Sequence, residues 1–225
     1  MPISQDFVVK VRGKEKIRSA LEKRLSDLEF RELIDFNGEP LEKNGKFGII
    51  CFPIPLENCP LSPFSEQDWY KDIGIKTLNG HSFDFRSSPD HLRVLRIMRD
   101  GSCRAFIDFY ENGMIITEHL LSHSDNPVVE ESIIAPLLDN FLETVVQVYN
   151  KALFDGGLQL TVYLFNIQGW NWLILNDNHL RENQQPSDEY HLEQELDTTV
   201  SAINSNIQST REVIFNKMKR GFNIY

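Results

Sequence analysis

The sequence predicts an α+β fold with a mainly antiparallel sheet, in which a three-stranded meander is packed by helices and a long C-terminal helix follows. Hairpin-type turns between alternating apolar and polar residues predict the meander, and segments with helical apolar spacing predict the helices. Because the strand and helix patterns are partly segregated along the chain, they are typical of the α+β class.

The first predicted elements are an amphipathic helix over residues 14–34 and a strand within residues 47–56. The helix is indicated by apolar residues at helical spacing among charged ones, which are Ile17, Leu21, Leu25 and Leu28. We expect the strand to end before Pro53 or to lie at a sheet edge, because proline has no N–H to donate. A Ser-x-x-Asp capping pattern that starts at Ser65 predicts a short helix next.

The strongest pattern is the meander between Leu92 and Leu121. Asp100-Gly101 and Asn112-Gly113 are preferred two-residue hairpin turns, whose central positions both adopt positive φ. Between the turns, Cys103, Ala105, Ile107 and Phe109 alternate with Arg104, Phe106, Asp108 and Tyr110. We therefore expect one apolar face covered by helices and one mixed face.

The second half of the chain predicts a core helix followed by a strand. A wide apolar stripe over residues 134–152 indicates the helix, with Pro136 in its first turn or at a kink. Gly156-Gly157 is expected to stop this helix, and residues 158–167 form the next predicted strand.

We divide the chain into an α+β core domain (1–176), an acidic polar loop (177–191) and a C-terminal helix (192–225). The last part carries a narrow apolar stripe at spacings of three, four and seven, which predicts a helix that docks on its own domain or on another chain. This C-terminal stripe is the candidate partner-binding surface, and it consists of Leu192, Leu196, Val200, Ile203, Ile207, Ile214 and Met218. Through it we expect a protein partner or a homo-oligomer.

Composition limits the class of protein. The 225 residues are 41% hydrophobic and 25% charged, which is typical of globular domains and excludes disordered and collagen-like chains. No apolar run could span a membrane and the N-terminus has no apolar signal core, so we expect a cytoplasmic protein without membrane contact. Cys51, Cys59 and Cys103 are an odd set without CxxC spacing, which predicts buried thiols and no disulfide framework.

No motif for a dinucleotide site, a P-loop, a zinc protease, a serine hydrolase or an EF-hand is present, so we expect no catalytic residue, no metal and no cofactor. His119 and His123 have the spacing of a metal pair on a helix, but here a strand and a loop are predicted. A hydrolase-like cleft in a loop over residues 81–91 is the least favoured hypothesis, with His81, Asp84, Arg86 and His91 as its residues.

Charge is unevenly distributed, with a total of −10 that would repel nucleic acid. Residues 177–197 hold seven carboxylates against Arg181, which indicates a solvated face or a docking patch for a basic partner. Residues 10–24 hold seven basic side chains against two carboxylates, which indicates a solvated helix face or a nucleic-acid-binding surface. The candidate nucleic-acid-binding residues are Lys10, Arg12, Lys14, Lys16, Arg18, Lys23 and Arg24. Trp170 and Trp172, at a strand end, are expected to be packed.

Three stretches, residues 22–64, 93–121 and 141–170, together carry a resemblance. Their helix, apolar strand, Asn-Gly hairpin and Gly-broken helix–strand pattern resembles the C-terminal region of bacterial proteins that begin with an Alba-type, Schlafen-like domain. That domain is assigned to DNA binding and often labelled ATP-binding. We expect that domain itself to be missing, because the resemblance starts at about residue 17, and therefore no catalytic or nucleotide-binding residue carries over.

These observations favour a non-catalytic cytosolic module for interaction or assembly. The resemblance implies a bacterial defence or transcription-regulatory setting. The alternative is a nucleic-acid-binding protein that uses the basic N-terminal residues, and a hydrolase-like enzyme is the least favoured.

Overall fold

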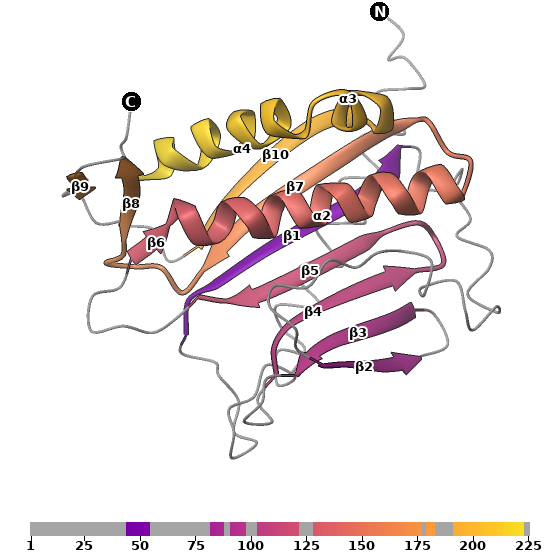
Figure 1. The fold of residues 1–225 in the computed structure, drawn as a ribbon, viewed down its shortest axis with the longest axis horizontal. Coiled ribbons are helices and arrows are strands. Elements are labelled where there is room, and N and C mark those ends of the chain that lie inside the picture. The colour runs from indigo at the N-terminus through magenta and orange to yellow at the C-terminus, as the bar shows by residue number, and fades with distance from the viewer. Residues whose placement is uncertain are drawn as a thin grey trace, which may run out of the picture.

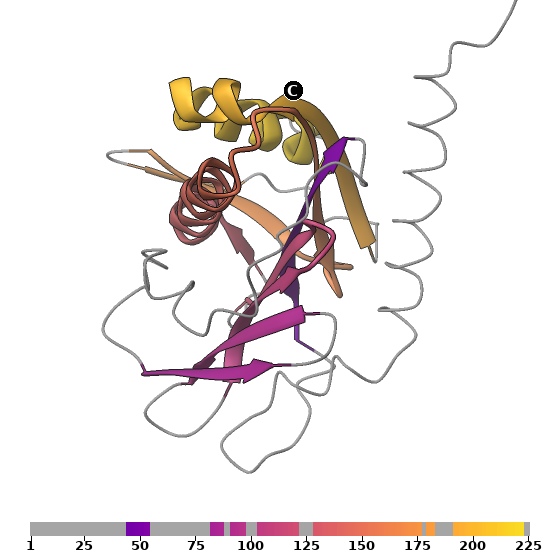
Figure 2. The same cartoon turned by 90° about the vertical axis from the view of Figure 1, so that its right-hand side faces the viewer.

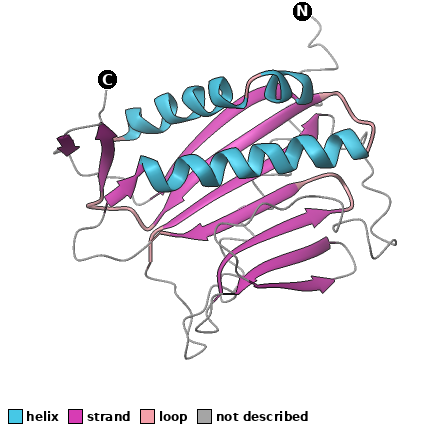
Figure 3. Cartoon of the chain, viewed as in Figure 1, coloured by secondary structure: helices cyan, strands magenta, loops and turns pink. Residues whose placement is uncertain are grey.

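The computed structural model describes residues 44–54, 82–87, 91–97, 103–121, 128–176, 179–182 and 191–222. The α+β prediction is confirmed, since these residues form a seven-stranded sheet, a three-stranded sheet and helices (Figures 1 and 3). The predicted helices over residues 14–34 and after Ser65 lie outside the described residues. No helix within the described ranges is long and apolar enough to cross a membrane.

The large sheet has the strand order β10-β7-β1-β5-β4-β3-β2, and all of its pairs are antiparallel. Its strands are β1 (Lys46–Ile54), β2 (Ser82–Ser87), β3 (His91–Ile97), β4 (Cys103–Tyr110), β5 (Ile115–Leu120), β7 (Gly157–Phe165) and β10 (His191–Thr199). The small sheet holds β6 (Val128–Glu130), β8 (Asn171–Asn176) and β9 (His179–Glu182).

The predicted meander is confirmed as β3, β4 and β5, but the turn after β4 differs from the expected two-residue type. Gly113 N donates to Tyr110 O at 3.0 Å and only Gly113 has positive φ there, at 87°. This is the geometry of a type I turn followed by a glycine bulge. The Asn112 side chain accepts from Met114 N at 3.1 Å, so the Asn-Gly pair still determines the turn.

Strand β1 lies in the middle of the sheet and continues through Pro53, which the sequence placed at a strand end or an edge. Its pairing with β5 stops at Cys51, whereas its pairing with β7 runs on to Ile54. At Pro53 the strand therefore has one neighbour, and locally it is an edge. The missing N–H is tolerated at such a position.

Three helices cover one face of the sheet, which we call the helix face (Figure 2). They are α2 (Glu131–Lys151), α3 (Val200–Ser205) and α4 (Ile207–Gly221). Alternate residues of β1, β7 and β4 point to these helices and form the main core with Leu138, Phe141 and Tyr149 of α2. Pro136 lies in the second turn of α2, so the Ser132 carbonyl, on an exposed residue, is left to solvent.

The C-terminal part departs most from the expected helix. Residues 191–199 form β10 and pair with β7 along its whole length, and helix begins only at Val200. The apolar spacing of four that indicated a helix also keeps Leu192, Leu196 and Val200 on one face of a strand, because side chains there repeat every two residues. The large sheet therefore extends past the predicted core-domain boundary at residue 176, because it includes β10.

Candidate functional site

The candidate site is the sheet face opposite the three helices, which we call the far face. Strand registers align its side chains in rows that cross the sheet. One row runs Arg93, Asp108, Ile116, Ile50, Thr161, Glu195, and the next runs Leu95, Phe106, Glu118, Gly48, Tyr163, Glu193. Each row passes from a buried, partly polar centre to an exposed carboxylate on edge strand β10.

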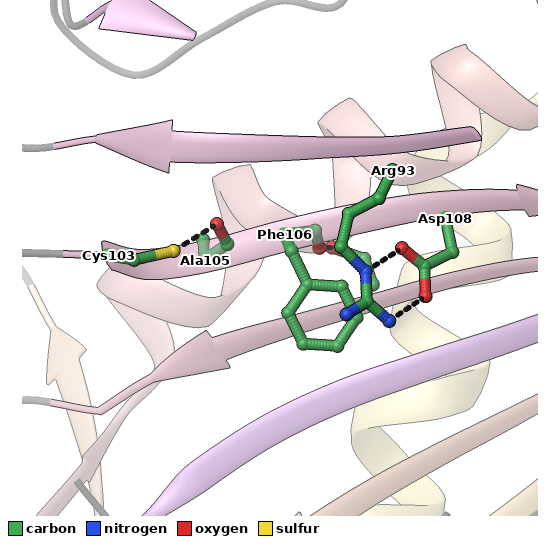
Figure 4. Close-up of polar contacts among 6 residues, drawn as sticks. Arg93, Cys103, Ala105, Phe106 and Asp108 are labelled. Atoms are coloured by element: carbon green, nitrogen blue, oxygen red, sulfur yellow. Dashed lines mark hydrogen bonds and ion pairs between the residues drawn. The ribbon is translucent and has the colours of Figure 1, made fainter. Parts of the chain in front are cut away.

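A buried ion pair joins β3 and β4 on this face (Figure 4). Arg93 Nε and Nη2 donate to the two carboxylate oxygens of Asp108 at 2.6 and 2.7 Å, and the side chains are 5% and 0% exposed. The guanidinium also lies over the Phe106 ring, 4.7 Å from its centroid. This bidentate geometry satisfies both charges internally, so the pair is a structural cross-link between strands.

A second polar contact crosses the centre of the face. Tyr163 on β7 donates its hydroxyl proton to Glu118 on β5, and the two residues flank Gly48 of β1 in the same row. A Cβ at Gly48 would overlap the Tyr163 ring, so only glycine lets this ring lie across β1 to reach Glu118. Both partners are about as buried as the core, at 1% exposure each.

Gln159 on β7 has a buried amide group that is not fully hydrogen-bonded. It is 2% exposed, and its Nε2 has no hydrogen-bond partner. It lies between Phe52 of β1 and Asp197 of β10 in the register. A buried amide without an acceptor costs about 1–3 kcal/mol, so this position favours a ligand that brings a carbonyl or carboxylate oxygen.

The edge strand β10 adds three exposed carboxylates to the far face. Glu193, Glu195 and Asp197 alternate with residues that face the helices, and all three are exposed. The Lys217 ammonium donates to the Glu195 carbonyl, so a cation of α4 covers one backbone acceptor of β10. Lysines are a common protection of edge strands against pairing with other chains.

His119 is the described histidine with a perturbed pKa, and it lies on the helix face of β5. Burial and, to a lesser extent, the Arg96 charge lower its pKa to about 3. Its Nε2 is 3.0 Å from Thr117 Oγ1, and its ring centroid is 6.4 Å from that of Phe47. The imidazole is therefore neutral in the folded protein at physiological pH.

This histidine should make the fold less stable in acid. The unfolded chain, with an ordinary histidine pKa near 6.5, takes up the proton first, so stability is full above about pH 6.5 and is lost as the pH falls toward 3. At pH 5 the loss amounts to about 2 kcal/mol. We expect His119→Gln to lose less stability than the wild type between pH 7 and pH 5, by urea unfolding at each pH. Equal losses in both proteins would contradict the assignment.

The cysteines and tryptophans lie where packing was predicted. Cys51 and Cys103 are buried free thiols, and Cys51 Sγ is 3.8 Å from the Tyr149 hydroxyl. Trp172 is fully buried, with Phe215 and Phe222 edge-on to it and its Nε1 3.2 Å from a Glu131 carboxylate oxygen. Cys59 lies outside the described residues.

The C-terminal stripe is buried against its own domain. Val200, Ile203, Ile214 and Met218 are at most 1% exposed, Leu192 is 7% exposed, and Leu196 and Ile207 are partly buried against the same core. The stripe thus packs on its own domain, which was one of the two predicted ways for it to dock, and its role in partner binding stays a prediction.

The loop predicted over residues 81–91 is largely strand. Asp84 and Arg86 belong to β2, in register with Leu95 and Arg93, and His91 begins β3 opposite Tyr110. The register places Asp84, Arg86 and His91 at alternating positions of one antiparallel hairpin, and the hydrolase-like hypothesis stays a prediction. His81, His123 and the seven basic residues of 10–24 lie outside the described residues. Within the described ranges, no group of three or more His, Cys, Asp or Glu could hold a metal ion.

The far-face residues were missed because each is unremarkable along the chain. The sequence did contain one signal: polar residues alternate with apolar ones in several strands that are neighbours in the sheet. Among these polar residues, Arg93 and Asp108 have opposite charges. Which of these positions face each other depends on register, and register is not visible in any single strand.

Comparisons with known proteins add no relationship: no family model, no curated protein and no solved structure matches this chain.

Proposed function

We propose that this chain is a non-catalytic interaction module that binds a basic, extended polypeptide segment along β10 and the adjoining far face. The observation that carries the proposal is the pairing of an acidic edge strand with a buried, unsatisfied amide. Glu193, Glu195 and Asp197 present carboxylates at every second residue of β10, and Gln159 Nε2 lies one strand inward without an acceptor.

The spacing explains why the ligand is extended. Carboxylates on one face of a strand recur about every 6.5–7 Å, which matches lysine or arginine at alternate positions of another extended chain. A backbone carbonyl of such a chain supplies the acceptor that Gln159 lacks.

The cellular setting follows the same proposal. A cytoplasmic location and a role in a bacterial defence or regulatory assembly are supported by the resemblance to Schlafen-like proteins carried by residues 22–64, 93–121 and 141–170. Homo-oligomers fit the proposal if the basic segment comes from a second copy, because residues 10–24 hold a net charge of +5, from seven basic and two acidic side chains.

Nucleic-acid binding is a second candidate, favoured by that same basic segment. It predicts binding that weakens steeply with salt and is reduced when Lys14, Lys16 and Arg18 are reversed in charge. The chain's overall charge of −10 opposes it.

A labelled peptide of alternating lysine and valine tests the leading proposal. We expect Glu193→Lys/Glu195→Lys/Asp197→Lys to weaken its binding at least about tenfold by fluorescence anisotropy, since three favourable ion pairs of about 0.2–1 kcal/mol each become repulsive. Gln159→Leu should weaken binding of the peptide. It should not lower the stability of the fold, because it removes an unsatisfied amide.

The matched control is Glu111→Lys/Glu143→Lys/Glu212→Lys, which makes the same change of net charge away from β10. If this control weakens peptide binding as much as the β10 variant does, the loss of binding comes from the overall charge of the protein, and the proposed site is wrong.

A further inference from the structure

Strand β10 ends the large sheet, and the direction of its backbone groups there follows from its pairing with β7 (Figure 1). Among the described strands, β7 is the one neighbour of β10. Val200 N donates to Gly156 O at 3.4 Å, and these residues are opposite each other when the β10–β7 register is continued by one position. Because the direction of the backbone groups alternates along an antiparallel pair, residues an odd number of positions before Val200 face away from β7. Glu193, Glu195 and Asp197 therefore direct their N–H and C=O groups to the outer side of β10.

A contact of α4 gives the same orientation independently. The Lys217 ammonium donates to the Glu195 carbonyl, so this carbonyl is directed at α4 and not at β7. The side chains of Glu193, Glu195 and Asp197 are exposed on the far face. The outer side of β10 thus combines main-chain donors and acceptors at every second residue with a carboxylate at the same residues. An extended peptide that adds to a sheet edge gains affinity from main-chain hydrogen bonds and specificity from side chains.

We infer that the basic segment binds as an added strand, antiparallel to β10, and that its backbone replaces the Lys217 ammonium at the Glu195 carbonyl. This inference rests on the proposed function, because it assigns a binding mode to the same ligand. Every pair in the large sheet is antiparallel, and opposite residues of such a pair carry their side chains on one face. A lysine or arginine of the added strand therefore lies beside each carboxylate of β10, whereas the β10 of a second copy would be repelled.

The position of Gln159 limits how far the paired stretch extends. Gln159 is opposite Asp197 on β7, so β10 separates it from the added strand. The acceptor for its Nε2 then comes from a ligand residue that lies beyond the paired stretch and crosses to the far face. The carboxylates of β10 and the Gln159 amide thus contact different parts of one ligand.

N-methylation of the lysine–valine peptide tests this binding mode on the full-length protein, because a methyl group removes one main-chain donor and leaves the side chain in place. In the antiparallel arrangement the lysine N–H groups point to β10 and the valine N–H groups point away from it. We expect N-methylation of the lysines to weaken binding at least about tenfold by fluorescence anisotropy, since several main-chain hydrogen bonds are lost. The peptide N-methylated at its valines is the matched control, and it should bind about as tightly as the unmodified peptide.

Lys217→Met tests the replacement of the ammonium at the Glu195 carbonyl. This variant removes the group with which the ligand competes, and we therefore expect it to bind the unmodified peptide about three- to tenfold more tightly than the wild type. Arg220→Met is the control, because it removes one positive charge from an exposed position of the same helix. Equal affinities of the two variants would show that the ligand does not replace Lys217.

The possible results separate this inference from the proposed function. If the unmodified peptide does not bind the wild type, the proposed function is wrong and the inference falls with it. If the unmodified peptide binds and N-methylation of its lysines is tolerated, the ligand does not pair with β10, and only the inference is wrong. Equal weakening by the two N-methylated peptides, or weakening by N-methyl-valine alone, would likewise contradict antiparallel pairing and leave the proposed function in place.

Discussion

Asp108→Ala is expected to destabilise the fold by about 3–5 kcal/mol, because it leaves the Arg93 guanidinium charged and buried without its partner. Arg93 and Asp108 are 5% and 0% exposed in their side chains and are joined by two hydrogen bonds. Most of this loss of stability comes from the Arg93 charge, which is left buried without a partner. Little of it measures the net contribution of the ion pair to stability. Arg93→Met combined with Asp108→Leu should therefore be much less destabilising than either partner's removal alone.

Denaturant unfolding followed by circular dichroism measures these differences. Arg104→Ala, on the same strand as Asp108 but exposed, is the control and should change stability by no more than about 0.5 kcal/mol. If the single and double variants of the pair lose equal stability, Arg93 and Asp108 do not act as a coupled pair.

Ile214→Ala is expected to cost about 2–5 kcal/mol, because Ile214 is 1% exposed in the core formed by α4, α2 and the sheet. The neighbouring residue provides a close control. Val213 is 41% exposed on the same helix turn, and Val213→Ala should be nearly neutral. The contrast follows from the direction of each side chain, since both changes remove aliphatic carbons at adjacent positions.

Light scattering and unfolding on the same samples separate the two roles that the C-terminal stripe could have. A core role predicts loss of stability with an unchanged molar mass, whereas an assembly role predicts dissociation with stability retained. If Ile214→Ala dissociates an oligomer and leaves the monomer fully stable, the stripe functions in assembly and not in packing α4 on its own domain.

Local signals were sufficient for the meander and the core helix. Asn112-Gly113 determines a tight turn through the Asn112 side chain and the positive φ of Gly113, whichever turn type forms. The wide stripe that predicted the 134–152 helix forms the buried face of α2. Ile134, Leu138 and Phe141 on this face are at most 3% exposed. In both cases the deciding interactions connect residues within about four positions of each other, so the chain carries them in its local pattern.

The same reasoning failed for the end of α2. The helix stops at Lys151, five residues before Gly156, and Leu153 rather than a glycine adopts the left-handed conformation, with φ of 55°. Phe154 N and Leu153 N donate to Tyr149 O and Asn150 O, which is the bonding of a Schellman motif. Packing of Phe154 on Tyr149, with ring centroids 5.5 Å apart, is the hydrophobic contact that accompanies this motif, and here no glycine marks the helix end in the sequence.

What the sequence determined was therefore the α+β class, the meander, the core helix and the uneven charge, since each depends on neighbours along the chain. Only the tertiary structure decided that residues 191–199 are a strand. A spacing of four fits both a helix and a strand, and nine residues of pairing with β7 select the strand. It also decided that Arg93 meets Asp108 and that Asp197 lies opposite Gln159, because register between strands places these groups together, and no single strand records that register.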